Sequence, residues 1–129
     1  MTTDTPFQPI AGSAVLTDEA ARPYDRRWLV VDDNDGWLAA DRAPGLAGLA
    51  ISLRFGYLVI RAEGMLRLDV PLDVIEDDDS VERTARIGDH DVRVVDEGEL
   101  AAAWFSQWLG QSCRLVKIHP EAGPVNWPV

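Results

Sequence analysis

The sequence predicts a mainly β protein of the α+β class: a small β-barrel of short, mostly antiparallel strands with one C-terminal amphipathic helix. Three observations lead to this prediction. Short apolar segments rich in β-branched and aromatic residues recur along the chain. Turn signals built on glycine, proline, asparagine and aspartate separate these segments. Only one late segment has the three- and four-residue apolar spacing of a helix.

The run from Trp28 to Asp32 is the expected central strand. Its four consecutive apolar residues fit a strand that is covered on both faces. Residues 32–36, Asp-Asp-Asn-Asp-Gly, end it with strong turn chemistry, and residues 37–40 restart the apolar pattern. Upstream, we expect short extended segments at residues 7–10 and 15–21.

The middle of the chain predicts hairpins. Residues 47–55 alternate between apolar and small or polar side chains, which is the period of a half-buried strand. Gly56 allows a tight reversal, and residues 57–61 return as the partner strand. The remaining strands are expected at residues 65–70, 81–87, 91–95 and 113–118, and the second and third of these flank a Gly-Asp-His turn.

One helix is predicted, from about Glu97 to Leu109. Asp96 followed by Glu99 three residues later has the pattern of a capping box. Gly110 is a typical C-terminal stop. The apolar residues that should pack on the barrel recur every three or four positions: Leu100, Ala101, Trp104, Phe105 and Trp108.

The composition limits the class of protein. The 129 residues fit one domain, and 47% of them are hydrophobic, which is enough for a buried core. The net charge of −10, from 22 acidic and 12 basic residues, argues against nucleic acid and anionic membrane surfaces as partners. No apolar run approaches the ~20 residues that cross a bilayer, and the first residues lack the pattern of a signal peptide. With one cysteine, a reducing cytoplasm is the expected location.

Catalytic and metal-binding residues are not predicted. His90 and His119 lie outside any nucleophile motif. Cys113 lies on an apolar strand, where a buried small side chain is expected rather than a thiolate. The acidic run at residues 76–79 lacks the alternating ligands of a calcium loop and is expected to be a solvated turn.

Arg26 is the first candidate for an anion-binding residue. The sequence Asp25-Arg26-Arg27 stands directly before the buried strand. A guanidinium group at the mouth of such a strand can hold a carboxylate or phosphate in a bidentate fork. The alternative is a surface ion pair with Asp25 or another acid, which would contribute about 0–1 kcal/mol.

Four motifs resemble one known family. Residues 24–32, Tyr-Asp-Arg-Arg-Trp-Leu-Val-Val-Asp, resemble the YDRxWhhVD signature of the MOSC N-terminal domain, the β-barrel module that precedes the molybdenum cofactor sulfurase C-terminal domain. Pro9-Ile10 stands where this family has its opening P-[IV]-K-S-C motif. Residues 42–46 resemble R-x-P-x-[LM], and residues 104–115 resemble the closing [WF]-[LF]-S-x-[WF]-L-G-x-x-[CV]-x-L. The resemblance covers residues 7–117 and implies a small barrel with a helix across one end.

The resemblance also implies a cofactor contact. In such proteins the barrel lends residues of the opening and DR motifs to the molybdopterin phosphate, and the following MOSC domain supplies the cysteine that ligates molybdenum. Arg26 matches the DR arginine, whereas Ala11 and Gly12 replace the family's Lys and Ser, and Ser13 falls at the Cys position. The expected cofactor-binding residues are therefore Arg26, Ser13 and Arg42.

Two functions stay open. In the first, the chain is the accessory N-terminal barrel of a molybdenum-cofactor-binding MOSC-type oxidoreductase, resembling enzymes that reduce N-hydroxylated compounds. It would be inert alone and partnered by a downstream MOSC domain of the same or a separate chain. No cofactor is then expected in this chain, although molybdopterin is possible in a full-length parent. In the second, the chain is a stand-alone binding module that has lost the cofactor contacts.

The sequence contains evidence for each alternative. The replacements at Ala11 and Gly12 favour the stand-alone module. The proline-rich ending is linker-like and favours a truncated parent, with a barrel domain at residues 1–118 and an exit segment or linker at 119–129. Trp127 in that segment is expected to be either exposed or docked on something outside this chain. A third interpretation, a carrier with a ligand in the barrel mouth, requires a hollow interior, and the many bulky aliphatic residues predict a filled one.

Overall fold

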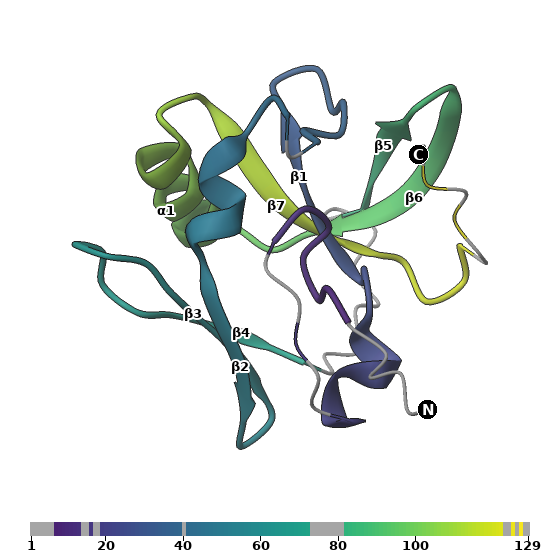
Figure 1. The fold of residues 1–129 in the computed structure, drawn as a ribbon. Helices are drawn as coiled ribbons and strands as arrows, with labels where there is room; N and C mark the ends of the chain where they lie inside the picture. The colour runs from purple at the N-terminus through teal and green to yellow at the C-terminus, as the bar shows by residue number, and fades with distance from the viewer. Residues whose placement is uncertain are drawn as a thin grey trace, which may run out of the picture.

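The computed structural model describes residues 7–13, 16, 19–39, 41–72, 82–122, 125 and 127. Two antiparallel sheets form the body, one with the strand order β1-β7-β6-β5 and one with the order β2-β3-β4 (Figure 1). The strands are β1 (Trp28–Asp32), β2 (Ala50–Arg54), β3 (Tyr57–Arg61), β4 (Leu68–Pro71), β5 (Glu82–Ile87), β6 (His90–Asp96) and β7 (Cys113–Ile118). The helices are two 3₁₀ segments, η1 (Glu19–Tyr24) and η2 (Pro44–Gly48), and one α-helix, α1 (Glu99–Leu109). The predicted fold class is confirmed.

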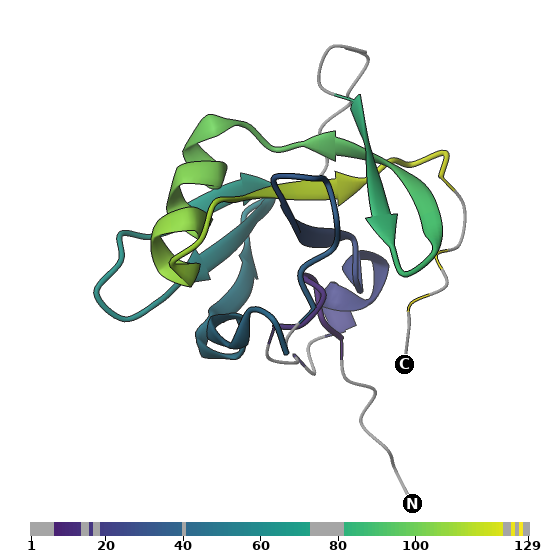
Figure 2. The same cartoon turned by 90° about the horizontal axis from the view of Figure 1, so that it is seen from above.

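The larger sheet is curled, and different elements lie at its two ends. In both views α1 lies at one end of the molecule and the β5–β6 hairpin lies at the other (Figures 1 and 2). The three-stranded sheet and η2 lie on the side of α1, and α1 contacts both η2 and β7. Among the helices that the structure describes, none is both long enough and apolar enough to span a bilayer.

The strand β1 is buried on both faces, as its sequence predicts. Trp28 and Val30 belong to the larger core cluster, which lies between the two sheets and α1. Leu29 and Val31 belong to a second cluster on the opposite face. In the sheet order β1 is terminal, and only β7 forms a full ladder with it.

Single bridges cover the other edge of β1. Ile10 pairs with Trp28 in parallel, and Trp37 pairs with Val31 after the turn at residues 32–36. The turn itself is closed by the Asp32 N–H donating to the Gly36 carbonyl at 2.9 Å. The expected strands at residues 7–10 and 37–40 are therefore reduced to isolated bridges.

Three expected strand segments differ in the structure. Ala47 and Gly48 belong to η2, because Pro44 at the start of this segment has the backbone torsion of a helical first turn. Residues 19–21 lie in η1, where Glu19 and Arg22 form an ion pair at 2.8 Å. Residues 65–67 precede β4, which begins only at Leu68. Residues 15, 17, 18, 40, 73–81, 123–124, 126 and 128–129, including the acidic run at 76–79, lie outside the described part of the chain.

The predicted capping box of the helix is wrong. The helix begins at Glu99, with Gly98 as its N-cap and no capping side chain. The Asp96 carboxylate instead accepts the Gly98 N–H at 3.1 Å and pairs with Arg114 at 2.7 Å. The C-terminal stop is confirmed, since Gly110 ends the helix with a φ of 72°.

The apolar face of α1 is confirmed in part. Trp104 and Phe105 are buried, and Trp108 is half-buried with its indole N–H donating to the Gly45 carbonyl at 2.8 Å. Leu100, however, is 77% exposed. Each residue turns an α-helix by about 100°, so a buried stripe centred on Ala101 and Phe105 leaves Leu100 on the flank.

The described positions of the C-terminal segment pack on the second cluster. The Trp127 ring meets Trp37 edge to face, with centroids 5.0 Å apart. Ala122 and Val125 contact the same cluster. Trp127 is therefore neither exposed nor docked on an external partner: it is half-buried and packs on the protein's own Trp37.

Replacing Trp104 with alanine is expected to destabilise the protein by about 3–5 kcal/mol, the usual cost of deleting a large buried aromatic side chain. The substitution also removes the indole N–H that donates to the Leu66 carbonyl at 2.6 Å. Urea denaturation measures the change, and Leu100→Ala on the exposed flank of the same helix is the control. Equal stability of the two variants would show that Trp104 is not a core residue.

Candidate functional site

The segment Gln8–Ser13 lies against the start of β1, beside the turn that carries Arg26. The Arg26 N–H donates to the Gln8 carbonyl at 2.6 Å, and the Trp28 N–H donates to the Pro9 carbonyl at 3.0 Å. In return, the Ala11 N–H donates to the Trp28 carbonyl at 2.9 Å. The structure therefore places the opening segment next to the Asp25-Arg26 turn.

Gln8 joins the two turns, through its side chain on the opening segment and through its backbone on the Asp25-Arg26 turn. Its amide nitrogen donates to the Ser13 carbonyl at 3.1 Å, and its amide oxygen accepts the Gly12 N–H at 3.4 Å. The Gln8 backbone N–H donates to the Asp25 carboxylate at 2.7 Å. Asp25 is thus engaged with the opening segment and not with the neighbouring arginine.

Arg26 presents a free cation beside this junction. The residue is exposed and has a φ of 53°, a backbone conformation that few non-glycine residues adopt. Within the described part of the chain, its guanidinium group has no hydrogen-bond or ion-pair partner. The surface ion pair with Asp25 is therefore not formed, and the Arg26 side chain is open to an external anion.

The other residues of the opening segment serve the fold. The Ser13 hydroxyl is buried and donates to the Ile10 carbonyl at 2.7 Å. Ala11 is 2% exposed, and its methyl group belongs to the second core cluster. Position 11 is thus an apolar position in this protein, and the Ser13 hydroxyl is used within its own turn.

Arg42 does not lie with Arg26 and Ser13. Its guanidinium group is 3.5 Å from the carboxylate of Asp32, at the far end of β1. Because a strand rises about 3.3 Å per residue, the two ends of β1 are about 13 Å apart. The structure therefore brings together Arg26 and Ser13 of the predicted cofactor-binding set, and it places Arg42 elsewhere.

The carboxylate of Asp32 holds the turn at the C-terminal end of β1. Burial alone would raise the pKa of its carboxyl group. Three groups act against burial: the N–H of Gly36, which donates to the carboxylate at 3.0 Å, the N–H of Asn34, which donates at 2.8 Å, and the nearby Arg42. Their combined effect is larger than that of burial, so the pKa lies below its usual value. The carboxylate is consequently held ionised in its turn.

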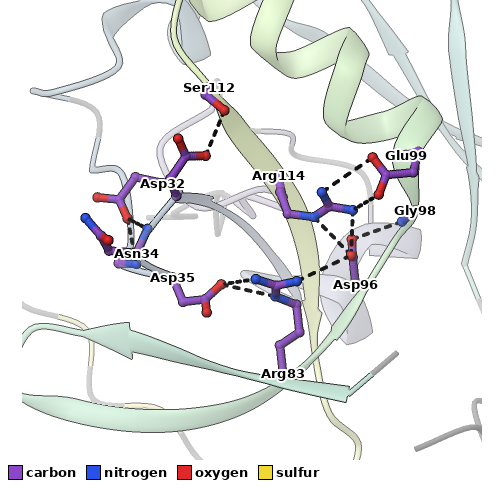
Figure 3. A network of polar contacts seen from close by, with 11 residues as sticks. Asp32, Asn34, Asp35, Arg83, Asp96, Gly98, Glu99, Ser112 and Arg114 are labelled. Carbon is purple, nitrogen blue, oxygen red and sulfur yellow. Dashed lines mark hydrogen bonds and ion pairs between the residues drawn. The ribbon is translucent and has the colours of Figure 1, made fainter. Parts of the chain in front are cut away.

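A network of ion pairs joins the larger sheet to α1, and sequence reasoning missed it (Figure 3). Arg83 donates to Asp35 at 2.8 Å and lies 4.0 Å from Asp96. Arg114 joins Asp96 to Glu99, at 2.7 and 3.0 Å. The paired groups come from different elements that are distant in the sequence, so the ion pairs can be recognised only in the folded structure. Each carboxylate has an arginine partner, which gives the network a structural role.

The remaining reactive side chains lack catalytic surroundings. Burial raises the pKa of the Cys113 thiol, although the Ser106 hydroxyl, 3.9 Å from its sulfur, opposes this effect. His90 lies 3.3 Å from Asp89 on the surface, and His119 lies 3.7 Å from Glu82. Among the described residues, no group of three His, Cys, Asp or Glu side chains could hold a metal ion.

Comparison with known proteins identifies the class. Two curled antiparallel sheets, one α-helix and an opening segment docked on the first long strand define a small β-barrel module. The chain belongs to the MOSC N-terminal beta barrel domain family, which it matches over residues 10–112. The family that the sequence motifs suggest is thereby confirmed.

The relatives are longer proteins of known name. Molybdenum cofactor sulfurase of Danio rerio is 35% identical over 101 residues, which are 76% of this chain and 12% of that protein. The sulfurase of Homo sapiens is 34% identical over 96 residues, 73% of this chain and 11% of its own length. Mitochondrial amidoxime reducing component 2 of Rattus norvegicus is 30% identical over 73% of this chain and 28% of its own length. This chain therefore spans a small part of the curated relatives it matches.

A solved structure matches the whole fold. The protein, from Bordetella bronchiseptica, has a solution structure and is 52% identical to this chain. The two superpose with a TM-score of 0.83 over 98% of each chain. The barrel described above is therefore shared with an experimentally determined relative.

Asp32→Asn is expected to lower stability at pH 7 by about 1 kcal/mol, because the charged acceptor of two N–H groups is lost. The folded-state pKa lies below the unfolded value, which is about 3.9. The contribution of Asp32 is therefore fully present above about pH 4 and disappears as the pH falls through the lowered pKa. Urea denaturation between pH 7 and about pH 2.5 should show the difference from wild type shrinking on acidification, with exposed Asp89→Asn as the control. A pH-independent difference would contradict the linkage.

Proposed function

We propose that this chain is the accessory N-terminal barrel of a molybdenum-cofactor-binding MOSC-type protein, and that it is not catalytic by itself. The observation that carries the proposal is the junction of the opening segment with Arg26, which is unpaired among the described residues. This is the place where the family resemblance puts the phosphate contact. The name of the molybdenum cofactor sulfurases supports a link to molybdenum cofactor chemistry.

The residues of the junction do not form a complete phosphate site. The Ala11 methyl group is buried in the core, and the Ser13 hydroxyl donates to the backbone. Arg26 is left as the one cationic donor of this described segment, and a single guanidinium group can supplement a phosphate site but not build one. The chain's own part is therefore to present Arg26 in a fixed turn, while the main cofactor pocket belongs to another domain.

The natural partner for such a barrel is a downstream MOSC domain, in the same or a separate chain. The description of the family as an N-terminal domain supports this partner. A reducing, cytoplasmic location remains our expectation, based on the single buried cysteine.

A second candidate function is a stand-alone interaction module. It is favoured by Ala11, because an alanine that is 2% exposed and packed in the second cluster belongs to the fold rather than to a binding site. In this case the barrel would be retained for its surface, and Arg26 would have no inherited role with a cofactor.

The purified chain is expected to show no turnover of an amidoxime in the presence of a chemical reductant. Its described residues hold no metal-ligand cluster, and its only thiol is buried. Chromatographic detection of the reduced product measures the reaction, with the reductant alone as the blank. Product formed in proportion to the concentration of this chain would overturn the assignment as an accessory domain.

Titration with inorganic phosphate is expected to shift amide NMR signals at residues 11–13 and 26, with millimolar affinity at best, because one arginine supplies the charge. Arg26→Ala should abolish the shifts. Arg42→Ala should leave them intact, since Arg42 is paired with Asp32 at the other end of β1.

The titration also separates the two candidate functions. Equal responses of wild type and Arg26→Ala would exclude a phosphate contact at Arg26 and favour the stand-alone module. Loss of the response in Arg42→Ala alone would move the anion site to the far end of β1.

A further inference from the structure

The outer face of the three-stranded sheet carries a set of side chains that the proposed function does not use. In the ladder Arg54 pairs with Tyr57, Ala50 pairs with Arg61, and Val59 pairs with Asp69. Since side chains alternate between the faces of a sheet, these residues share one face. The opposite face is the core face: Ile51, Leu58, Ile60, Leu68 and Val70 are buried in the larger cluster.

The centre of this outer face is a hollow with an apolar floor. Val59 is only 5% exposed although it points away from the core, because longer side chains stand around it. The hollow has a volume of about 310 Å³ and is lined by Arg54, Phe55, Tyr57, Arg61, Arg67 and Asp69. This volume is at the lower end of the range for small-molecule sites, roughly 300–1,000 Å³.

Positive charge gathers around the hollow in excess of its local partners. Asp69 is the carboxylate in the lining, and it pairs with Arg67 at 3.1 Å. The guanidinium groups of Arg54 and Arg61 have no hydrogen-bond or ion-pair partner within the residues that the structure covers. Arg61 and Arg67 both line the hollow, next to the last ladder pair of Ile60 with Leu68, and like charges near one another repel. On a protein of net charge −10, the cations of Arg54 and Arg61 are available for an added anion.

Aromatic rings stand at the end of the same face. Phe55 is 94% exposed at the tip of the β2–β3 hairpin, which extends away from the four-stranded sheet (Figure 1). Its φ of 51° and the φ of 82° at Gly56 form a two-residue turn that normally selects asparagine, aspartate or glycine at the first position. A phenylalanine in this position gains nothing from burial and is disfavoured by the backbone. Tyr57, the next residue in the lining, is also exposed.

We propose that this face binds a small ligand that combines a flat ring with a phosphate group, the chemical class of a nucleoside monophosphate. Arg61 binds the phosphate through charge-assisted hydrogen bonds. Arg54 is beside Tyr57 in the ladder, about 13 Å away at the other end of β3, and it lies next to the ring. The ring lies over Val59 and stacks on Phe55 or Tyr57. The site lies on the opposite sheet from the Arg26 junction, so it stands independently of the proposed function.

The test is an amide NMR titration of the whole chain with AMP, compared with adenosine and with inorganic phosphate. Saturable shifts at residues 54–61 and 67–69 are expected with AMP. Adenosine and phosphate should each bind at least about tenfold more weakly than AMP, because adenosine lacks the phosphate contact and phosphate lacks the ring contact.

Three variants test the phosphate-binding part and the ring-binding part of the site separately. Arg61→Gln should weaken AMP by about tenfold, the effect of losing one charge-assisted contact, and Arg54→Gln should weaken it less, because Arg54 lies beside the ring. Phe55→Asn suits the turn and so preserves the hairpin; it should weaken AMP but leave phosphate unchanged. Arg86→Gln is the control, since Arg86 is an exposed strand arginine on the other sheet that pairs with Asp91.

Several results would overturn the proposal. Absence of saturable shifts in the wild-type chain would do so, as would shifts confined to residues 8–13 and 26, which would instead assign the phosphate to the Arg26 junction. Unchanged AMP affinity in Arg61→Gln would also reject the site. Binding of an acidic peptide to this face without any response to AMP would assign the face to a protein partner instead.

Discussion

The burial of β1 on both faces is the constraint on which the rest of the structure depends. Because neighbouring side chains of this strand enter two separate cores, each face needs its own cover. The indole N–H of the fully buried Trp28 also needs an acceptor. It donates to the Glu97 carboxylate at 2.6 Å, and Lys117 lies 5.0 Å from the ring. Glu97 lies two residues before the first residue of the helix, so the strand that builds the core also anchors the segment that leads into α1.

The same strand determines which functional side chains can cooperate. Its start holds the opening segment and the Arg26 turn, and its end holds the Asp32 turn with Arg42. A strand of five residues keeps those ends apart, whatever the order of the arginines in the sequence. The sequence motifs that contain Arg26 and Arg42 therefore mark two ends of one strand and not one pocket.

Features that depend on neighbouring residues could be predicted from the sequence, and features that depend on distant partners could not. The apolar run of β1, the Phe55-Gly56 hairpin and the Gly110 stop are local, and the structure contains all three. The capping box failed because Arg114, 18 residues away, binds the Asp96 carboxylate. For the candidate site, the sequence identified Arg26 as a possible anion ligand, but the hydrogen bond from the Ser13 hydroxyl to the Ile10 carbonyl became visible only in three dimensions.

Net charge and local charge lead to different conclusions about partners. The total of −10 predicts repulsion of anions, and it correctly describes a chain rich in carboxylates. Many of these carboxylates, however, pair with arginines of the four-stranded sheet, as Asp35 does with Arg83 and Glu82 does with Arg93. The outer face of β2-β3-β4 has Asp69 as its local acid, and this acid pairs with Arg67. Because screening confines exposed charges to a range of about 10 Å, a phosphate at that face would interact mainly with the guanidinium groups beside it rather than with the described carboxylates of the four-stranded sheet.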